Sequence, residues 1–138
     1  MLFRSEAEIK KDAIQAIATG LEMHERLKFL NQSLAAKGLP QIEIGVGIHT
    51  GKVVAGSVGG KERLSYSVVG DTVNTSSRLE SLNKKISEQF ERPYNIVLSA
   101  ATSTLIQNNY ATQDLGKIPI RGRNEMMNLY TVVKRKID

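Results

Sequence analysis

The most constraining feature of this chain is the stretch Ile42–Ile48, in which an isoleucine or a valine occupies every second position. This strict alternation predicts a β-strand in which Ile42, Ile44, Val46 and Ile48 face a core. The opposite face carries Glu43, Gly45 and Gly47. Glycine weakens a strand unless another backbone or a ligand approaches it closely. Seven of the eleven glycines lie between Gly45 and Gly70, so we expect a close approach in this part of the chain.

Helical and strand patterns surround this stretch. Apolar residues spaced by three and four predict a long amphipathic helix from Ala7 to Lys37, which Gly38 and Pro40 then end. The order of elements predicts one α+β domain, residues 1–138, with helices packed on a mixed sheet. The remaining predicted elements are a hairpin of strands at 53–58 and 64–69 with its tip near Gly60, a helix capped by Asp71 or Thr72 and running to about Phe90, a strand at 96–98, a helix capped by Ser99, and a strand pair at 115–120 and 127–133.

The composition excludes several classes of function. The chain has no cysteine, which excludes disulfides and thiolate sites, and its two histidines, His24 and His49, are too far apart in sequence to suggest a zinc site. No apolar run is long enough to span a membrane and the N-terminus lacks the core of a signal peptide, so we expect a cytoplasmic domain without membrane contact. The net charge of +5 permits nucleic-acid binding, but three Phe and four Tyr offer no stacking platform, so we expect no nucleic-acid partner.

Asn74 and Arg78 are four residues apart and therefore share one face of the predicted helix. An amide and a guanidinium would project together from its first two turns, beside the positive end of the helix, where anionic oxygens are favoured. Spacing alone favours the more common alternative, a solvated polar flank.

Two further segments combine glycine with charge. The turn Arg121–Arg123 either clamps a phosphate or forms a solvated hairpin tip, and by itself it favours the hairpin tip. The glycine-rich hairpin is not a P-loop, because Gly60 and Lys61 are followed by Glu62. Close packing of its strands against a partner is favoured over phosphate binding. We expect His24 on the surface and assign no role to His49.

Together these segments resemble the class III nucleotide cyclase catalytic domain, the adenylyl and guanylyl cyclase family. The resemblance covers nearly the whole chain and implies a ferredoxin-like nucleotide cyclase fold, truncated at the N-terminus, with a mixed, mostly antiparallel sheet. The string Gly-Asp-Thr-Val-Asn-x-x-x-Arg-Leu-Glu is highly specific, so a functional role for Asn74 and Arg78 becomes the favoured interpretation. The matching residues are Ile44–Gly51, Gly56, Gly59, Tyr66–Glu80, the turn at 121–123 and Leu129–Tyr130.

The resemblance implies a role for each matching residue. Asn74 would orient the ribose, and Arg78 would stabilise the charge that develops on the α-phosphate as the 3′-hydroxyl attacks it. Arg123 would hold the terminal phosphates. Ser67 occupies the purine-reading position and would contact the substrate together with Val68. A serine hydroxyl can accept a hydrogen bond from the adenine amino group, so this residue favours ATP over GTP.

The family also uses Mg or Mn ions, held by two aspartates. Neither aspartate motif occurs here, so the resemblance implies that both aspartates lie upstream of Met1 and that this chain is the C-terminal two-thirds of the domain. We therefore expect the chain alone to be inactive and to bind no metal specifically. Family members act as antiparallel dimers, so we expect a homodimer or a heterodimer with another cyclase domain, and a sheet with an unpaired edge. The open alternatives are a guanylate cyclase and a non-catalytic cyclase-like module for regulation or dimerisation.

Overall fold

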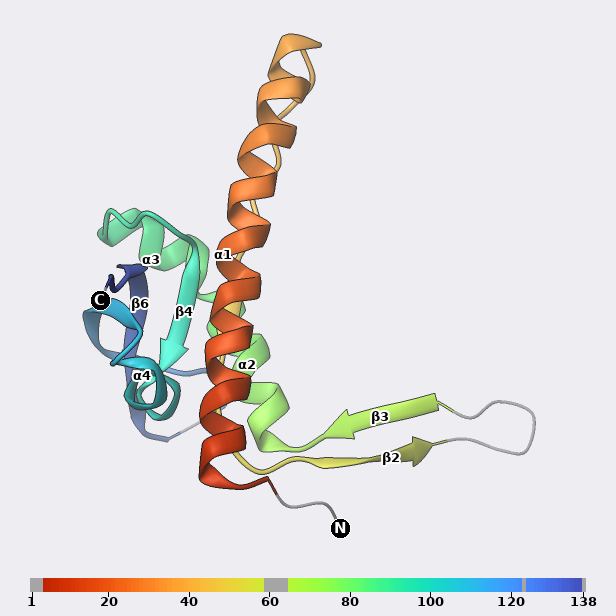
Figure 1. Ribbon diagram of the computed structural model, residues 1–138, viewed down its shortest axis with the longest axis vertical. Coiled ribbons are helices and arrows are strands. Elements are labelled where there is room, and N and C mark those ends of the chain that lie inside the picture. The colour runs from red at the N-terminus through yellow and green to blue at the C-terminus, as the bar shows by residue number, and fades with distance from the viewer. Residues whose placement is uncertain (1–3, 59–64, 123, 138) are drawn as a thin grey trace.

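A computed structural model describes residues 4–58, 65–122 and 124–137. The elements lie in three layers, with helices covering both faces of a central four-stranded sheet (Figure 1). The α+β class and the mixed sheet are therefore confirmed. In chain order the elements are α1 (Glu6–Ala36), β1 (Val46–Ile48), β2 (Val54–Val58), β3 (Ser65–Val69), α2 (Asp71–Ser81), α3 (Asn83–Gln89), β4 (Ile96–Ser99), α4 (Ala100–Ile106), β5 (Tyr110–Pro119) and β6 (Met126–Arg135).

The central sheet has the strand order β1-β4-β6-β5. β1 runs parallel to β4, whereas the pairings of β4 with β6 and of β6 with β5 are antiparallel. All four residues of β4 are buried, as is typical of a strand covered on both faces. In the described part of the chain β1 and β5 form the two edges, which agrees with the expected unpaired edge.

Successive residues of β4 contribute to two separate cores. Ile96 and Leu98 pack against α1 and α4, whereas Val97 packs against α2 and α3 on the opposite face. The first core consists of Ala13, Ile17, Ile96, Leu98, Ile106, Tyr110 and Val132, and the second of Leu79, Ile86, Val97, Leu115, Ile120 and Leu129. The second face of the sheet therefore supports the helix that carries Asn74 and Arg78.

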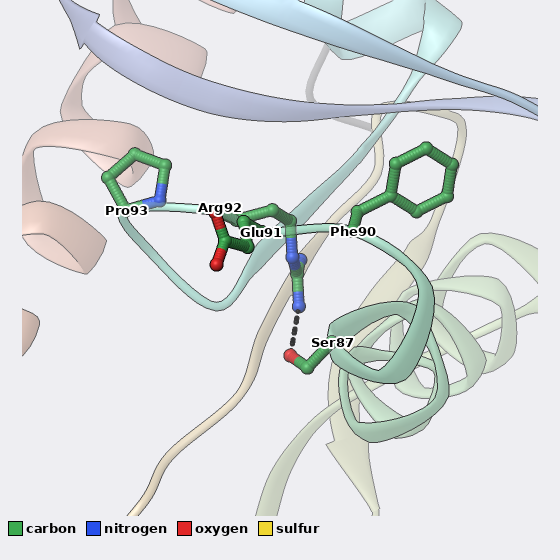
Figure 2. Close-up of a pocket in the computed structure, with 5 residues that line it drawn as sticks. All are labelled: Ser87, Phe90, Glu91, Arg92 and Pro93. Atoms are coloured by element: carbon green, nitrogen blue, oxygen red, sulfur yellow. Dashed lines mark hydrogen bonds between the residues drawn. The ribbon is translucent and has the colours of Figure 1, made fainter.

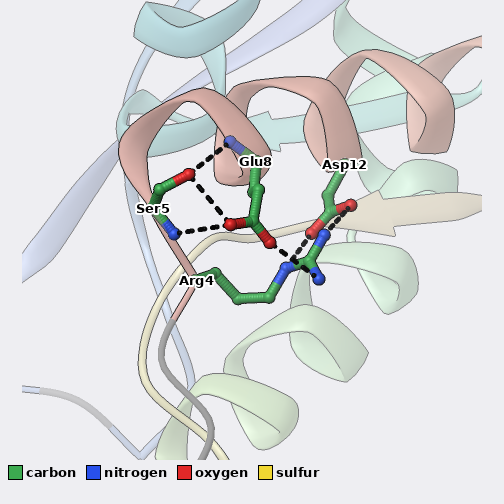
Figure 3. Close-up of polar contacts among 4 residues, drawn as sticks. All are labelled: Arg4, Ser5, Glu8 and Asp12. Atoms are coloured by element: carbon green, nitrogen blue, oxygen red, sulfur yellow. Dashed lines mark hydrogen bonds and ion pairs between the residues drawn. The ribbon is translucent and has the colours of Figure 1, made fainter.

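The ends of α1 are fixed by local hydrogen bonds. At its start the Ser5 hydroxyl accepts the Glu8 N–H, and the Glu8 carboxylate accepts the Ser5 N–H, which is a capping box (Figure 3). Arg4 pairs with Asp12 at 2.8 Å and with Glu8 at 3.2 Å. At the other end Gly38 adopts a φ of +71°, as predicted for a helix stop.

Only the first half of α1 packs on the sheet. Ala13, Ile17 and Gly20 are buried, whereas Phe29 and Leu30 in the second half are 70% and 46% exposed. Figure 1 shows this second half extending beyond the sheet. The predicted helix is right in extent, but its apolar stripe is covered only along the half that the sheet can reach.

β1 is shorter than the alternating stretch predicts. Its ladder covers only Val46–Ile48, and Ile42 is 46% exposed. The Asn31 side chain binds the backbone N–H and C=O of Ile42 at 2.7 and 2.8 Å, so this segment follows α1 instead of the sheet. The expectation that Ile42 faces a core is therefore wrong, whereas Val46 and Ile48 do pack against the first core.

β2 and β3 pair antiparallel, as predicted, but they form a separate ribbon that projects from the body (Figure 1). The predicted tip near Gly60 lies outside the described residues. Val54 and Val69 stand opposite one another in the ladder and are 69% and 54% exposed. Apolar side chains on this ribbon are thus left in contact with solvent.

The helix predicted from 71 to 90 is in fact two helices, α2 and α3, which meet at Leu82. The residue at the N-cap of α2 is Gly70, with a φ of +139° and no side-chain hydrogen bond, so the predicted capping by Asp71 or Thr72 is wrong. Asp71 lies instead in the first turn, where a carboxylate stabilises the positive end of a helix.

Candidate functional site

Gly47 allows α2 to lie directly on β1. A Cβ atom at Gly47 would stand 2.5 Å from the Ser76 carbonyl oxygen and closer still to the Glu80 amide nitrogen. The helix backbone therefore occupies the space that any other side chain would need. The predicted close approach is confirmed at both glycines of this stretch: the approaching group is the backbone of α2 at Gly47 and the Asn83 side chain at Gly45.

α2 carries Asn74 in its first turn and Arg78 in its last. The Asn74 side chain is exposed, and its backbone N–H donates to the Gly70 carbonyl at 3.2 Å. Arg78 is half-buried. Because the helix ends at Ser81, Arg78 lies at its negative end. The expectation that both side chains stand beside the positive end therefore holds for Asn74 only.

The turn after β5 lies against Arg78. Gly122 has a φ of +83°, and a Cβ atom there would stand 2.9 Å from Arg78 Nη2 and 3.1 Å from its Cζ. The guanidinium is thus in close contact with the backbone of this turn, and the missing side chain makes room for it. Two of the three segments that the sequence singled out meet at this point.

Two of the remaining predicted substrate residues, Ser67 and Val68, belong to β3 of the ribbon. Ser67 pairs with Gly56 in the ribbon, but its side chain lies outside the described part of the structure. Val68 is 47% exposed on the same strand. Arg123 lies outside the described residues. The ribbon leads into the start of α2 through Gly70, so Val68 and Asn74 are connected by a short stretch of chain.

A divalent metal ion needs several oxygen ligands close together. Mg²⁺ is bound through carboxylate oxygens, usually together with substrate phosphates. No three His, Asp or Glu side chains in the described ranges gather closely enough to hold a metal ion. These residues alone do not fit such an ion, so no chemical step through a metal is assigned to them.

Several buried polar groups had no signal in the sequence. His24 is half-buried, and not on the surface as expected, because its Nδ1 lies 2.8 Å from the Gly20 carbonyl and its Nε2 accepts the Asn95 N–H. His49 Nδ1 lies 2.8 Å from Ser99 Oγ, where β1 and β4 end side by side. The contacts of His24 with Asn95 and of His49 with Ser99 join segments that are far apart in the chain, so no local pattern predicts them.

An open hollow lies between the last turns of α3 and the loop that follows it, lined by Ser87, Phe90, Glu91, Arg92 and Pro93 (Figure 2). Among the described residues that line it there is no predicted site residue. The Arg92 guanidinium donates to the Ser87 hydroxyl at 2.8 Å. Among the described helices, none is both long and apolar enough to cross a lipid bilayer.

Comparison with known proteins decides the family. The model of the adenylate and guanylate cyclase catalytic domain matches residues 2–134. This chain belongs to that family. The cyclase domain is 37% identical to Adenylate cyclase 1 of Rhizobium meliloti (strain 1021) over 123 residues, which is 89% of this chain and 18% of that protein. It is also 33% identical over 97 residues to a membrane guanylyl cyclase of Dictyostelium discoideum, covering 70% of this chain and 6% of that protein.

A solved structure supports the same fold. The crystal structure of the adenylyl cyclase CyaB from P. aeruginosa superposes with a TM-score of 0.79 at 33% identity, covering 92% of this chain and 61% of that one. The cyclase fold expected from the sequence is therefore confirmed. The chain spans only 18% of the Rhizobium meliloti relative, so the activity of the whole protein is a matter for proposal.

Proposed function

We propose that this cyclase domain contributes half of an active site that converts ATP to cyclic AMP and pyrophosphate. The observation that carries the proposal is the contact between Arg78 and the turn at Gly122, with Asn74 on the same helix. A guanidinium held against a backbone is ready to bind phosphate oxygens without first losing side-chain freedom. The similarity to adenylate cyclases of known sequence and structure supports the same conclusion.

In this proposal each group acts on charge or orientation. The substrate's 3′-oxygen bonds to the α-phosphorus as its proton passes to solvent, and the bond from that phosphorus to pyrophosphate breaks. Arg78 stabilises the negative charge that develops on the phosphate oxygens, while Asn74 binds the ribose and fixes the direction of attack. Arg123 binds the leaving phosphates. Groups that hold Mg or Mn come from outside the described residues, and such ions supply charge neutralisation at the triphosphate.

Partnership with a second cyclase domain is part of the proposal. The ribbon of β2 and β3 exposes Val54, Val68 and Val69, and a two-stranded ribbon is only marginally stable without packing. Covering these valines with a second subunit removes apolar surface from water. The partner is a second copy of this chain or another cyclase domain, in the cytoplasm.

The choice of ATP over GTP rests on Ser67 and on the adenylate cyclase relatives. A guanylate cyclase remains the second candidate, because the membrane guanylyl cyclase of Dictyostelium discoideum is also 33% identical. Competition between the two nucleotides in one assay separates these candidates. Faster turnover of GTP than of ATP would assign the domain to the synthesis of cyclic GMP.

A mixing assay tests the proposal. This chain is combined with a class III cyclase subunit that keeps its metal-binding aspartates but has lost its own Asn and Arg at the positions matching Asn74 and Arg78. We expect cyclic AMP and pyrophosphate in equal amounts from the mixture, measured by chromatography. Arg78→Ala should lower kcat by about 10²- to 10³-fold, as removal of one transition-state donor does.

The matched control is Lys85→Ala, which removes a positive charge from an exposed position on α3. It should leave the mixture as active as the wild type. If the two subunits associate in sedimentation experiments but form no product, the non-catalytic alternative is correct instead.

A further inference from the structure

Arg92 and Asn83 form a hydrogen-bonded pair beneath the junction of α2 and α3. Arg92 Nη1 donates to Asn83 Oδ1 at 3.1 Å, and Arg92 Nη2 donates to the Asn83 carbonyl at 3.0 Å. The same Nη2 donates to Ser87 Oγ at 2.8 Å, as Figure 2 shows. One guanidinium thus joins the loop after α3 to the start and the middle of that helix.

Asn83 in turn ties the end of α2 to the sheet. Its Nδ2 donates to the Val46 carbonyl in β1 and to the Glu80 carbonyl in α2, both at 3.1 Å. The side chain is 5% exposed. Because both amide hydrogens face carbonyls, the Oδ1 atom must face Arg92, which is the donor it needs. Arg92 therefore fixes the orientation in which Asn83 can hold β1.

Burying the Arg92 guanidinium in this way costs more free energy than a contact that only stabilises the fold would justify. The described partners of Arg92 are neutral oxygens, and its Nε is buried without a hydrogen-bond partner. Burial lowers the pKa of Arg92, because the charged form loses solvation. A buried unsatisfied donor costs free energy and calls for a specific explanation. The buried Nε is also out of reach of a ligand, so anion binding in the adjacent hollow does not explain it.

The place of Arg92 next to the end of α2 offers a better explanation for its burial. α2 lies against β1 at Gly47 in its middle, and the Asn83 amide holds its C-terminal end at Val46. Arg78 lies one turn before that end. A shift of this end of α2 would carry the guanidinium away from Gly122, and small displacements of reacting groups have large effects on rate.

We propose that Arg92 is a positioning residue of the nucleotide site, acting through Asn83 to hold the end of α2 where Arg78 meets the Gly122 turn. This inference rests on the proposed function of Arg78. It assigns Arg92 no contact with the substrate. Its effect should appear in the chemical step, because Arg78 acts on charge that exists only in the transition state.

The mixing assay tests the inference with Arg92→Met, which keeps the apolar stem and removes the donors. We expect kcat to fall about 10-fold or more with KM nearly unchanged. Arg92→Lys should recover part of the loss, because one ammonium can donate to one or two of the three acceptors but cannot reproduce the fork. Asn83→Ala combined with Arg92→Met should be no slower than the slower single variant, since both break one connection.

Lys85→Met is the matched control, because it removes a charge from an exposed position of α3, the helix that Arg92 contacts. It should not change kcat. An unchanged kcat in Arg92→Met would overturn the inference, whatever happens to Tm. A raised KM with unchanged kcat would do the same, because it would indicate a role in ground-state binding.

Amide hydrogen exchange separates this inference from the proposed function. In Arg92→Met the amides of residues 78–83 should exchange faster, while those of β5 and β6 keep their protection. If the wild-type mixture makes no cyclic nucleotide, the proposed function fails, and the exchange pattern still tests the connection. Unchanged exchange at residues 78–83 would show that Arg92 does not hold α2.

Discussion

At the scale of single residues, glycines decide how closely the parts of the site approach one another. Gly47 brings the α2 backbone onto β1, and Gly122 brings a turn onto Arg78. The two positions differ in kind: Gly122 also needs its positive φ of +83°, whereas Gly47 is needed for space alone. Each therefore allows a substitution with a matched control elsewhere in the chain.

Gly47→Ala should destabilise the domain by about 1–3 kcal/mol, because the new methyl group overlaps helix backbone that cannot move without repacking the core. The control is Gly56→Ala, since a Cβ at Gly56 would meet none of the described atoms within 4 Å. That variant should be neutral or more stable by up to about 1 kcal/mol. Urea unfolding measures the free energy of unfolding of both variants, and an equal decrease in both would contradict the close packing of α2.

Gly122→Ala should lower kcat in the mixing assay, because its methyl group would displace the Arg78 guanidinium. Gly116→Ala is the control, with a similar φ of +82° and no described atom within 4 Å of the new Cβ. Both should lose about 1 kcal/mol of stability from backbone strain. A similar loss of kcat in both variants would mean that contact with Arg78 is unimportant.

At the scale of elements, the register between the long strands β5 and β6 shifts at irregularities in their ladder. The ladder shifts between Asp114 and Gly116, and Gly116 has a φ of +82°, as at a β-bulge. The Gly116 N–H donates to Asp114 Oδ1 at 2.7 Å, and Asn128 Nδ2 donates to the same oxygen at 2.8 Å. These hydrogen bonds, the backbone one first, lower the pKa of Asp114 below its ordinary value.

Acid should therefore weaken this part of the sheet. A carboxyl group with a lowered pKa in the folded state stabilises the fold above its unfolded pKa, and this contribution is lost as pH falls through the folded pKa. Between about pH 5 and pH 2 the unfolding free energy of the wild type should fall more steeply than that of Asp114→Asn. Urea unfolding across this range measures both slopes, and parallel slopes would contradict the assignment.

The helices also differ in how well the sequence predicted their first and last residues. The helix predicted at 7–37 is observed at Glu6–Ala36, because its start and stop signals are local: a capping box and a glycine. The helix predicted at 71–90 breaks at Leu82 instead. The side chain that holds this break, Asn83, reaches Val46 and is held by Arg92, and neither contact leaves a local pattern.

At the scale of the whole molecule, the ribbon of β2 and β3 projects from a body that is otherwise covered on both faces (Figure 1). Val54, Val68 and Val69 on it are exposed, and β1 presents a sheet edge in the described part of the chain. Exposed apolar surface and unpaired edges both favour association with another chain. The proposed dimer would use this surface.

Val54→Lys should weaken self-association at least about 10-fold in Kd, because it places a charge among apolar side chains at the interface. Gln89→Lys is the control, the same new side chain at an exposed position in the last turn of α3. Sedimentation velocity over a range of concentrations measures the dissociation constants. A wild-type chain that stays monomeric at high concentration, or equal effects of both variants, would contradict a role of the ribbon.

The sequence by itself determined the fold class, the extent of α1 and the need for a close approach at Gly45 and Gly47, because periodicity, caps and glycine act within a few residues. It also singled out Asn74 and Arg78, through one specific string and a resemblance to a known family. Tertiary structure alone decided that the α2 backbone is the group at Gly47, that Gly122 meets Arg78, and that Arg92 holds Asn83. These contacts depend on which strands pair and in which register, and pairing is settled by the whole core and not by neighbours along the chain.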